Sequence, residues 1–406
     1  MQDNPAKSTA PRWAELSLIV LFLTFLWAPT LDTLLHLDRS TLPKENRLPA
    51  PFPEWQSGSR GLKNFLAGLN AYFNDHFGWR NRLIHWHRRL QLGLFPAENQ
   101  ASPGVIIGRD GWLFLNADGT TIDYYRGTRR FTPQDLRDWQ ALLEHRRDWL
   151  ARLGIKYLFV VAPNKQSIYS EEVPDWWKRD RPDTKLDQLI AYMRAHSTVE
   201  VVDLRAALRD ARQIAPTYFK TDSHWNPFGG FIGYQEIIKA LAKQMPGLEP
   251  LPLSDFTIER PLRPSSYLAD WADWDVNETC AVLLIPKPGL PPLEMSQPFL
   301  EYSDFIVGVT ENPQARGTVA VFGDSFQNCL APYLGYHFRT VTFHKQHALP
   351  EQWLAKERPD VVVSEMVEQE FDMTDPNTLD EPGDFLMRPH RQLLPTKPPG
   401  EAVDAR

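Results

Sequence analysis

Two short clusters of polar residues have the chemistry and the spacing that acyl transfer needs. The first is Gly323-Asp324-Ser325, which directly follows the apolar run 318–322. A glycine permits a tight turn at the end of a strand, and the N-terminus of a following helix offers N–H groups to an oxyanion. The same tripeptide is also a favourable turn and helix cap. Taken alone, it is therefore compatible with either a nucleophilic serine or a structural turn.

The second cluster contains Asp222 and His224, two residues apart in the segment 221–226. In an extended loop, side chains at that spacing point the same way. The carboxylate could then hold one imidazole nitrogen while the other nitrogen faces Ser325, as a serine nucleophile requires. The alternative is that Asp222 caps the next helix and that His224 packs against Trp225. Combined with a serine at the same edge of a sheet, the cluster predicts a Ser-His-Asp triad.

Alternating strand and helix patterns predict the elements that must position these clusters. Thr132 and Pro133 predict the start of a helix that ends before Gly154, because threonine caps helices and proline suits the first helical position. The apolar run 157–162 predicts a strand buried on both faces. This order predicts an α/β fold with a parallel sheet and helices on both faces. The remaining predicted elements are helices near 186–194 and 231–243 and strands near 199–204, 318–322, 339–343 and 361–363.

The two ends of the chain differ from this pattern. Residues 16–31 contain no charged side chain, and Lys7 and Arg12 precede them. We therefore expect residues 1–38 to be an uncleaved membrane anchor, with a cleaved signal peptide as the alternative. Either interpretation places the body outside the cytoplasm. The other predicted segments are a Pro-rich spacer at 39–60, a catalytic domain at 61–372 with an irregular insertion at about 245–315, and an irregular tail at 373–406.

Composition excludes several classes of protein. The 44 basic and 51 acidic side chains give a net charge of −7, whereas nucleic-acid binding needs clustered basic residues. The chain has two cysteines, Cys280 and Cys329, which is too few for a disulfide scaffold or a cysteine-rich zinc module. They could form one disulfide or remain free thiols. The histidines at 85, 87 and 145 lack ligand-like spacing with carboxylates, so we expect no metal and no cofactor.

The ordered combination of these motifs resembles the SGNH-hydrolase-like alginate O-acetyltransferases, the AlgJ/AlgX group. In that group the Asp-x-His precedes the serine in the chain. The resemblance implies a flavodoxin- or SGNH-like sheet, with Ser325 as nucleophile, His224 as base and Asp222 as the residue that orients it. The other matching motifs are Glu45-Asn46-Arg47, Phe73-Asn74-Asp75-His76-Phe77-Gly78-Trp79-Arg80, Gly108-Arg109-Asp110-Gly111-Trp112-Leu113-Phe114 and Ala162-Pro163-Asn164-Lys165.

This resemblance implies an O-acetyltransferase that modifies hydroxyls of an extracytoplasmic polysaccharide, alginate-like or another exopolysaccharide, through an acetyl-serine intermediate. It also implies a membrane-bound O-acyltransferase partner that supplies acetyl groups, and a place in the periplasm at the inner membrane. Two alternatives remain open. A carbohydrate acetylesterase would use the same three residues with water as acceptor, and a non-catalytic scaffold would bind the polymer without turnover.

Several further residues are candidates for the same site. Three groups are candidate oxyanion or substrate contacts: the backbone N–H of Ser325, the residue Gly323 and the residue Asn164. Trp225 could stack on a sugar ring, as aromatic side chains beside sugar sites do. Glu365 ends the predicted strand 361–363, and we expect it to cap the following segment rather than to face the site.

Overall fold

Contacts within the computed structural model divide the chain into two compact units, residues 1–96 and 97–406. Residues 61–96, which the sequence placed in the catalytic domain, therefore fall in the first unit. The described residues are 12–35, 50–55, 58–80, 82–83, 86–87, 90, 101–102, 104–116, 119–272, 274, 276–290 and 308–380.

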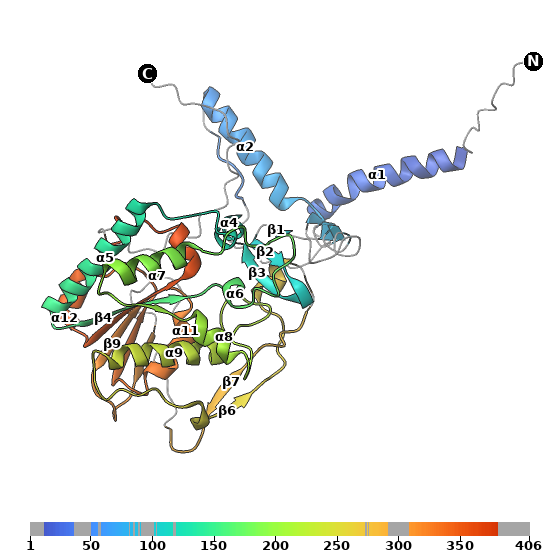
Figure 1. Cartoon of the computed structure of the whole chain (residues 1–406). Helices are drawn as coiled ribbons and strands as arrows, with labels where there is room; N and C mark the ends of the chain where they lie inside the picture. Colours follow the sequence, from blue (N-terminus) through green and yellow to red (C-terminus); the bar gives the residue numbers. More distant parts are fainter. Residues whose placement is uncertain are drawn as a thin grey trace, which may run out of the picture. The chain divides into compact units, whose positions relative to one another are not determined.

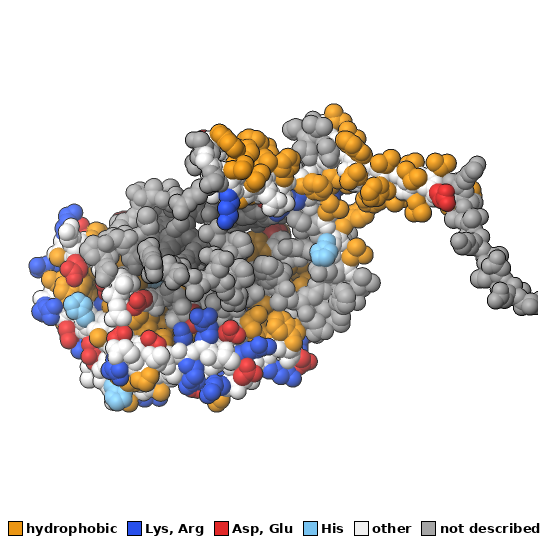
Figure 2. Space-filling model, turned by 90° about the horizontal axis from the view of Figure 1, so that it is seen from above, with side chains coloured by type: hydrophobic (Ala, Val, Ile, Leu, Met, Phe, Trp, Pro, Cys, Tyr) orange, Lys and Arg blue, Asp and Glu red, His pale blue; other side chains and the backbone are white. Residues whose placement is uncertain are grey.

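The first unit contains two long helices, α1 (Arg12–Leu35) and α2 (Ser59–His76). The side chains of α1 are largely hydrophobic and exposed, and they form an apolar band in Figure 2. Within the described part of the chain, however, no helix is both long and apolar enough to cross a membrane. The described residues therefore give no support to the membrane anchor that the sequence predicts at residues 1–38. Most of the predicted spacer at 39–60 lies outside the described residues.

The second unit is built around a mixed, mostly parallel sheet of six strands among the described residues. Strands 157–162, 318–322 and 339–343 were predicted, and each forms within one residue of its predicted bounds. The edge strand β8 runs antiparallel to β10, so the sheet is not wholly parallel. In spatial order the strands are β5 (Val201–Asp203), β4 (Lys156–Ala162), β11 (Val361–Val367), β9 (Thr318–Phe322), β10 (Thr340–His344) and β8 (Gly308–Glu311).

Alternate side chains of the central strands enter two separate hydrophobic cores. Leu158 and Val160 of β4 contribute to one core, whereas Tyr157 and Phe159 contribute to the other. This alternation follows from the period of two in a strand. Figure 1 shows the corresponding helices on the two sides of the sheet. The first core includes α8 (Arg205–Ala211), α9 (Pro227–Ala242) and α11 (Gln327–Leu334), and the second includes α5 (Pro133–Arg152), α7 (Lys185–His196) and α12 (Glu351–Glu357).

The helix starts follow from capping residues in the sequence. Thr132 accepts a hydrogen bond from the backbone N–H of Asp135, and Asp135 accepts one in return from the N–H of Thr132. Such a capping box satisfies two backbone donors that the helix itself cannot. Asn226 caps α9 by accepting from the N–H of Gly229 at 3.0 Å. That cap also fixes the end of the loop that carries Asp222 and His224.

The segment predicted as an irregular insertion contains regular structure. It supplies β8 to the main sheet and forms β6 (Phe256–Glu259), α10 (Tyr267–Ala272) and β7 (Leu283–Pro286). The pairing of β6 with β7 is antiparallel. Remaining elements are β1 (Ala101–Ser102), β2 (Gly104–Ile107), η2 (Arg109–Gly111), β3 (Leu113–Asn116), α4 (Thr120–Arg126), α6 (Lys165–Ile168), η4 (Leu253–Asp255) and η5 (Glu368–Asp372).

The described start of the predicted tail packs against the second unit. Asp380 accepts hydrogen bonds from both Nε and Nη2 of Arg146, at 2.9 and 2.6 Å. Arg146 is buried on α5, so this ion pair joins residue 380 to the helix. Residues 381–406, the rest of the predicted tail, lie outside the described residues.

Candidate active site

Ser325 lies in the turn between β9 and α11, at the carboxyl edge of the sheet. The turn passes very close to β11, because Ser364 of β11 pairs with Phe322, the last residue of β9. A Cβ atom on Gly323 would lie 2.4 Å from Oε2 of Glu365 and 2.9 Å from its carbonyl oxygen. Glycine is therefore required at this position by close approach, as the sequence motif suggested.

The side chain of Asp324 fixes the shape of this turn. Its Oδ1 accepts from the backbone N–H of Phe326 at 2.9 Å, and its Oδ2 accepts from the N–H of Val367 at 2.7 Å. One bond closes the turn on itself, and the other ties it to the end of β11. Asp324 is thus a structural member of the Gly-Asp-Ser motif, and Ser325 is the member that remains partly exposed.

The structure brings Asp222, His224 and Ser325 together in one hydrogen-bonded row. Nε2 of His224 lies 2.6 Å from Oγ of Ser325, and Nδ1 of His224 lies 2.6 Å from Oδ1 of Asp222. The same Oδ1 accepts from the backbone N–H of His224 at 3.0 Å. The second interpretation of the cluster, in which Asp222 caps α9, is wrong, since Asn226 is the cap.

Asp222 is held as a carboxylate by its neighbours. Burial raises the pKa of its carboxyl group, but hydrogen bonds from His224 and Ser266 outweigh burial and lower this pKa to about 2. Oγ of Ser266 donates to Oδ2 of Asp222 at 2.7 Å. An ionised Asp222 accepts the Nδ1 proton of His224, which leaves Nε2 free to receive a proton from Ser325.

Lys165 holds the loop that carries Asp222 in place through hydrogen bonds to its backbone. Its ammonium group donates to the backbone carbonyls of Phe219, Lys220 and Asp222, at 3.2, 3.2 and 2.5 Å. The side chain is 2% exposed and lies against the ring of Trp112. Burial lowers the pKa of Lys165 to about 7, although the negative charge of Asp222 opposes that change.

The insertion supplies a second set of contacts to the same loop. The carboxylate of Glu278 accepts from the backbone N–H groups of Lys220 and Thr221, at 3.0 and 2.7 Å. The hydroxyl of Tyr267 donates to Oγ of Ser223 at 2.5 Å. Together with Ser266, these residues surround the loop with donors and acceptors. Sequence reasoning missed all three, because the insertion shows neither a periodic pattern nor a recognisable motif.

Among the candidate oxyanion contacts, two have unoccupied donors. The backbone N–H of Ser325 has no hydrogen-bond acceptor among the described residues, and neither has the buried Nδ2 of Asn164. By contrast, the N–H of Gly323 donates to the carbonyl of His344 at 3.1 Å. Trp225 is fully buried, and its Nε1 donates to the carbonyl of Phe326 at 2.9 Å. Trp225 therefore supports the turn and presents no ring face to a sugar.

Two acidic side chains, Glu365 and Glu370, interact with Asp324 of the turn. Glu365 lies within β11 and is fully buried, so the expectation that it caps the following segment is wrong. Its Oε2 accepts from the backbone N–H of Asp324 at 3.2 Å. Burial and the nearby Asp324 raise the pKa of Glu365 well above its usual value. The same two causes raise the pKa of Glu370 to about 7.

The cysteines and the possible metal-ligand groups of the described residues bear on further chemistry at this site. Among the described residues, no three histidine, cysteine, aspartate or glutamate side chains are grouped so that they could hold a metal ion. Cys280 and Cys329 are free thiols, which decides between the two alternatives for the cysteines. Burial raises the pKa of Cys329 to about 12, so this thiol stays protonated and unreactive.

The second unit has an SGNH-like α/β fold with a mixed, mostly parallel sheet, and a Gly-Asp-Ser turn lies at the carboxyl edge of that sheet. Residues 105–274 match the family described as "SGNH hydrolase-like domain, acetyltransferase AlgX". The match includes Asp222 and His224 and ends before Ser325.

Individual relatives agree with this match. The probable alginate O-acetylase AlgJ of Pseudomonas aeruginosa PAO1 is 31% identical over 169 residues, which is 40% of this chain and 38% of that protein. AlgJ of Pseudomonas syringae pv. tomato is 26% identical over 229 residues, 55% of this chain and 54% of that protein. The chain thus spans about half, or less, of the length of these relatives. The predicted resemblance to the AlgJ/AlgX group is confirmed.

A solved structure supports the fold. PatB1 from Bacillus cereus, in a structure with a sulfonyl adduct, aligns over 68% of this chain and 98% of its own length. The identity is 18% and the TM-score is 0.50. At that identity the likeness shows the shared fold alone.

Proposed function

We propose that this chain transfers an acetyl group to a hydroxyl of an extracytoplasmic polysaccharide, with Ser325 as the nucleophile. The observation that carries the proposal is the row of three side chains, with 2.6 Å from Oγ of Ser325 to Nε2 of His224 and 2.6 Å from Nδ1 of His224 to Asp222. These distances lie within the range in which a base can take the proton of a nucleophile.

The reaction follows from that geometry in two balanced steps. Nε2 of His224 takes the proton of Ser325 as Oγ attacks the carbonyl carbon of an acetyl donor, and the donor's leaving group departs with that proton. Ser325 then carries the acetyl group as an ester. A sugar hydroxyl attacks this ester while His224 takes its proton, and the proton returns to Oγ as the acetylated sugar leaves. Asp222 stays ionised and stabilises the imidazolium formed in each step.

The negative charge that develops on the carbonyl oxygen needs hydrogen-bond donors. The backbone N–H of Ser325 and Nδ2 of Asn164 are our proposed donors, because both lack an acceptor among the described residues. The N–H of Asn164 donates to Oε2 of Glu368 at 3.0 Å, which fixes the backbone from which that side chain extends.

The relatives named alginate O-acetylases support a polysaccharide acceptor, alginate-like or another exopolysaccharide. In our proposal the acetyl donor is a membrane-bound O-acyltransferase, and the reaction takes place in the periplasm at the inner membrane. Both statements rest on the resemblance to the AlgJ/AlgX group. A carbohydrate acetylesterase would use the same residues, and it differs only in that water accepts the acetyl group.

One assay separates these functions. The purified full chain is incubated with a small acetyl ester and an oligosaccharide, beside the variants Ser325→Ala and Ser254→Ala, the latter being an exposed serine in η4. Acetylated sugar from the wild type and the Ser254 variant, but not from the Ser325 variant, supports transfer. Acetate without acetylated sugar supports the esterase. Equal product from all three proteins would exclude both, and polymer binding without any turnover would support a scaffold.

A further inference from the structure

Two separate supports hold the loop that carries Asp222 and His224. One is α6, whose first residue, Lys165, donates to three backbone carbonyls of the loop. The other is the insertion, which reaches the carboxylate of Asp222 itself, because Oγ of Ser266 donates to its Oδ2 at 2.7 Å. The first support therefore places the backbone of the loop, and the second sets the direction of the side chain.

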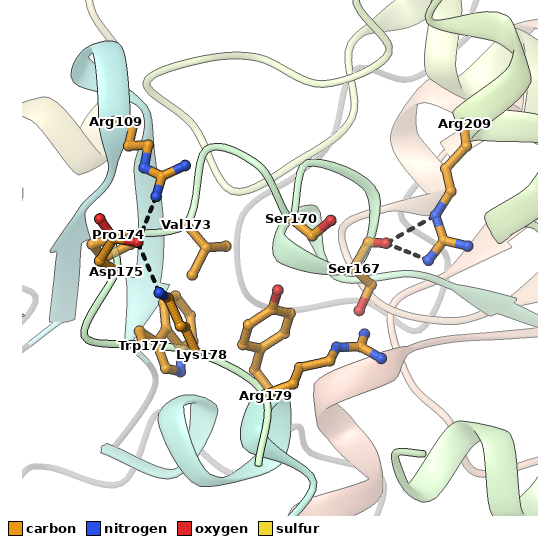
Figure 3. A pocket seen from close by; sticks show the side chains of 11 residues that line it. Arg109, Ser167, Ser170, Val173, Pro174, Asp175, Trp177, Lys178, Arg179 and Arg209 are labelled. Carbon is orange, nitrogen blue, oxygen red and sulfur yellow. Dashed lines mark hydrogen bonds and ion pairs between the residues drawn. The ribbon is translucent and has the colours of Figure 1, made fainter. Parts of the chain in front are cut away.

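The support from α6 is fixed in turn by α8 and the residue after it. Figure 3 shows the guanidinium group of Arg209 directed at Ser167, the third residue of α6. Nε and Nη2 of Arg209 donate to the carbonyl of Ser167 at 3.2 and 2.6 Å. Arg212 donates to the carbonyl of Ile168 at 2.5 Å. These bonds hold the backbone of α6, so they leave the direction of the Asp222 carboxylate undetermined.

Only one rotation of the Asp222 carboxylate serves His224. Its Oδ1 accepts from the backbone N–H and from Nδ1 of His224, at 3.0 and 2.6 Å. A carboxylate that is bonded through one oxygen can still turn about its Cβ–Cγ bond, because that terminal torsion is soft. The hydroxyl of Ser266 removes this freedom, since it fixes Oδ2 as well.

Ser266 is itself held by Thr221, the residue before Asp222. The backbone N–H of Ser266 donates to Oγ1 of Thr221 at 2.9 Å. The hydroxyl of Thr221 donates to Oε2 of Glu278 at 2.7 Å. Thr221 is 0% exposed and Glu278 is 2% exposed, so little water competes for these bonds. Ser266 therefore bonds to two consecutive residues of the loop.

The protons of this network can be arranged in one direction only. Glu278 is an acceptor, because three backbone N–H groups also donate to its carboxylate. Thr221 must therefore give its single hydroxyl proton to Glu278, and its oxygen accepts from the N–H of Ser266. The hydroxyl proton of Ser266 then remains for Asp222. The chain of donors thus presents an O–H group, not a lone pair, to the carboxylate.

The residue after Ser266 extends the same contact along the loop. The hydroxyl of Tyr267 donates to Oγ of Ser223 at 2.5 Å. Two consecutive residues at the start of α10 thus meet Asp222 and Ser223, which fixes the register of the helix against the loop. The carbonyl of Ser266 also accepts from the N–H of Ala269 at 2.9 Å, so the first turn of the helix holds the serine in place.

We propose that Ser266 is a positioning residue of the active site, which orients the carboxylate of Asp222 toward Nδ1 of His224. The insertion thereby supplies part of the active site from outside the Asp-x-His and Gly-Asp-Ser motifs. The proposal rests on the proposed function in that the reaction is taken to depend on Asp222 and His224. It adds that this pair is kept in its working geometry by Ser266, which Thr221 holds.

Two measurements on the full chain test this role. Proton NMR of the chain, isotope-labelled at histidine, records the Nδ1 proton of His224, which a short hydrogen bond to a carboxylate moves far downfield. Loss of this signal in Asp222→Asn assigns it. Steady-state kinetics with a small acetyl ester gives kcat and KM. The variants are Ser266→Ala and Thr221→Val, and the matched controls are Ser254→Ala and Thr257→Val, two exposed residues in η4 and β6 of the same insertion.

Ser266→Ala should lower kcat by about tenfold or more with KM nearly unchanged, because small displacements of a catalytic group have effects of this size. The Nδ1 signal of His224 should move upfield, while the midpoint of thermal unfolding stays within a few degrees of the wild type. Thr221→Val should change kcat and the signal in the same direction. The double variant should resemble Ser266→Ala, because Thr221 acts through Ser266. Both controls should match the wild type.

An unchanged Nδ1 signal or an unchanged kcat in Ser266→Ala would overturn the proposal. So would losses of kcat that multiply in the double variant, since residues that act independently have additive free energies. If Ser266→Ala does not fold, the same two measurements on Thr221→Val decide the question. A wild type without activity on acetyl esters would end the proposed function instead, and the Nδ1 signal would still show whether Ser266 orients Asp222.

Discussion

The backbone carbonyl of Asp222 accepts a hydrogen bond from the buried ammonium group of Lys165, at 2.5 Å. Lys165 begins α6, directly after β4, whereas Asp222 belongs to a loop between α8 and α9. The position of the carboxylate that orients His224 is therefore tied to the central sheet through one lysine. This contact makes Lys165 a positioning residue for the proposed reaction.

Lys165→Met should lower kcat for a small acetyl ester by about 10-fold to 100-fold, because a displacement of about 1 Å in a catalytic group can have such an effect. KM should change much less. The check is steady-state kinetics beside Lys156→Met, which replaces a lysine at the opposite end of β4. Unchanged kcat in Lys165→Met, or an equal loss in Lys156→Met, would contradict the positioning role.

The titration of Lys165 should also be visible in stability. Its pKa is about 7 in the folded chain against 10.5 when exposed, so between these values the unfolded chain binds more protons. The free energy of unfolding of the wild type should thus rise relative to Lys165→Met as the pH increases from 7 to 10. Asp222, Glu278 and Cys280 face this ammonium group, and they are present in both proteins. Denaturant titrations at the two pH values measure the difference, and a constant or falling difference would contradict the assignment.

Asp222→Asn should reduce kcat by several orders of magnitude, on the order of 10⁴, while the fold is retained. An amide cannot stabilise the imidazolium, and it favours the wrong tautomer of His224. Asp210→Asn serves as the control, because Asp210 is an exposed aspartate near the end of α8.

Asp222 should also contribute to stability in a way that depends on pH. Since the pKa of Asp222 is depressed to about 2, its contribution to stability is present above about pH 4 and is lost as the pH falls toward 2. An acid unfolding curve that is identical in Asp222→Asn would exclude that contribution.

Gly323→Ala should destabilise the chain by about 1–3 kcal/mol or more, because the new methyl group would overlap the side chain and backbone of Glu365. The double variant with Glu365→Ala should recover part of the loss, since 2.4 Å from Cβ to Oε2 is the shortest of the three contacts. Thermal unfolding of the two single variants and the double variant gives the coupling free energy between residues 323 and 365. Strictly additive changes would show that the two residues do not compete for space.

Glu365→Gln should change the free energy of unfolding little near pH 4. Burial and Asp324 raise the pKa of Glu365, so folding favours the protonated carboxyl group, whose shape and lack of charge a glutamine reproduces. A carboxyl with a raised pKa stabilises fully only below the unfolded pKa, and this stability falls as the pH rises. The variant should therefore become more stable relative to the wild type between pH 4 and pH 7, as denaturant titration would measure. The opposite trend would mean that Glu365 is ionised.

The parts of the fold that the sequence predicts are those with a strong local signal. The runs 157–162 and 318–322 are continuous and apolar, and both are buried strands. The strand predicted at 361–363 in fact extends to Val367. Glu365 interrupts the apolar pattern where its side chain packs against Gly323 of the Gly-Asp-Ser turn.

The candidate site also contains residues that a local sequence signal predicts and residues that it does not. Asp222, His224 and Ser325 have the residue types and the order that acyl transfer requires, and their approach needs only that two loops share one edge of a parallel sheet. Ser266, Tyr267 and Glu278 could not be assigned, because their roles depend on long-range contacts of an insertion without periodicity. The sequence makes Trp225 a candidate sugar contact, but its indole is buried beside Phe326.

Mass spectrometry of the acylated chain tests the proposed mechanism most directly. The full chain is mixed with a small acetyl ester, stopped in acid within the first turnovers, digested and searched for an added acetyl group. We predict that the peptide containing Ser325 gains one acetyl group, that the ester disappears when an oligosaccharide acceptor is added, and that Ser325→Ala shows neither the ester nor acetylated sugar. Acetylated sugar formed at the wild-type rate by Ser325→Ala would contradict the mechanism.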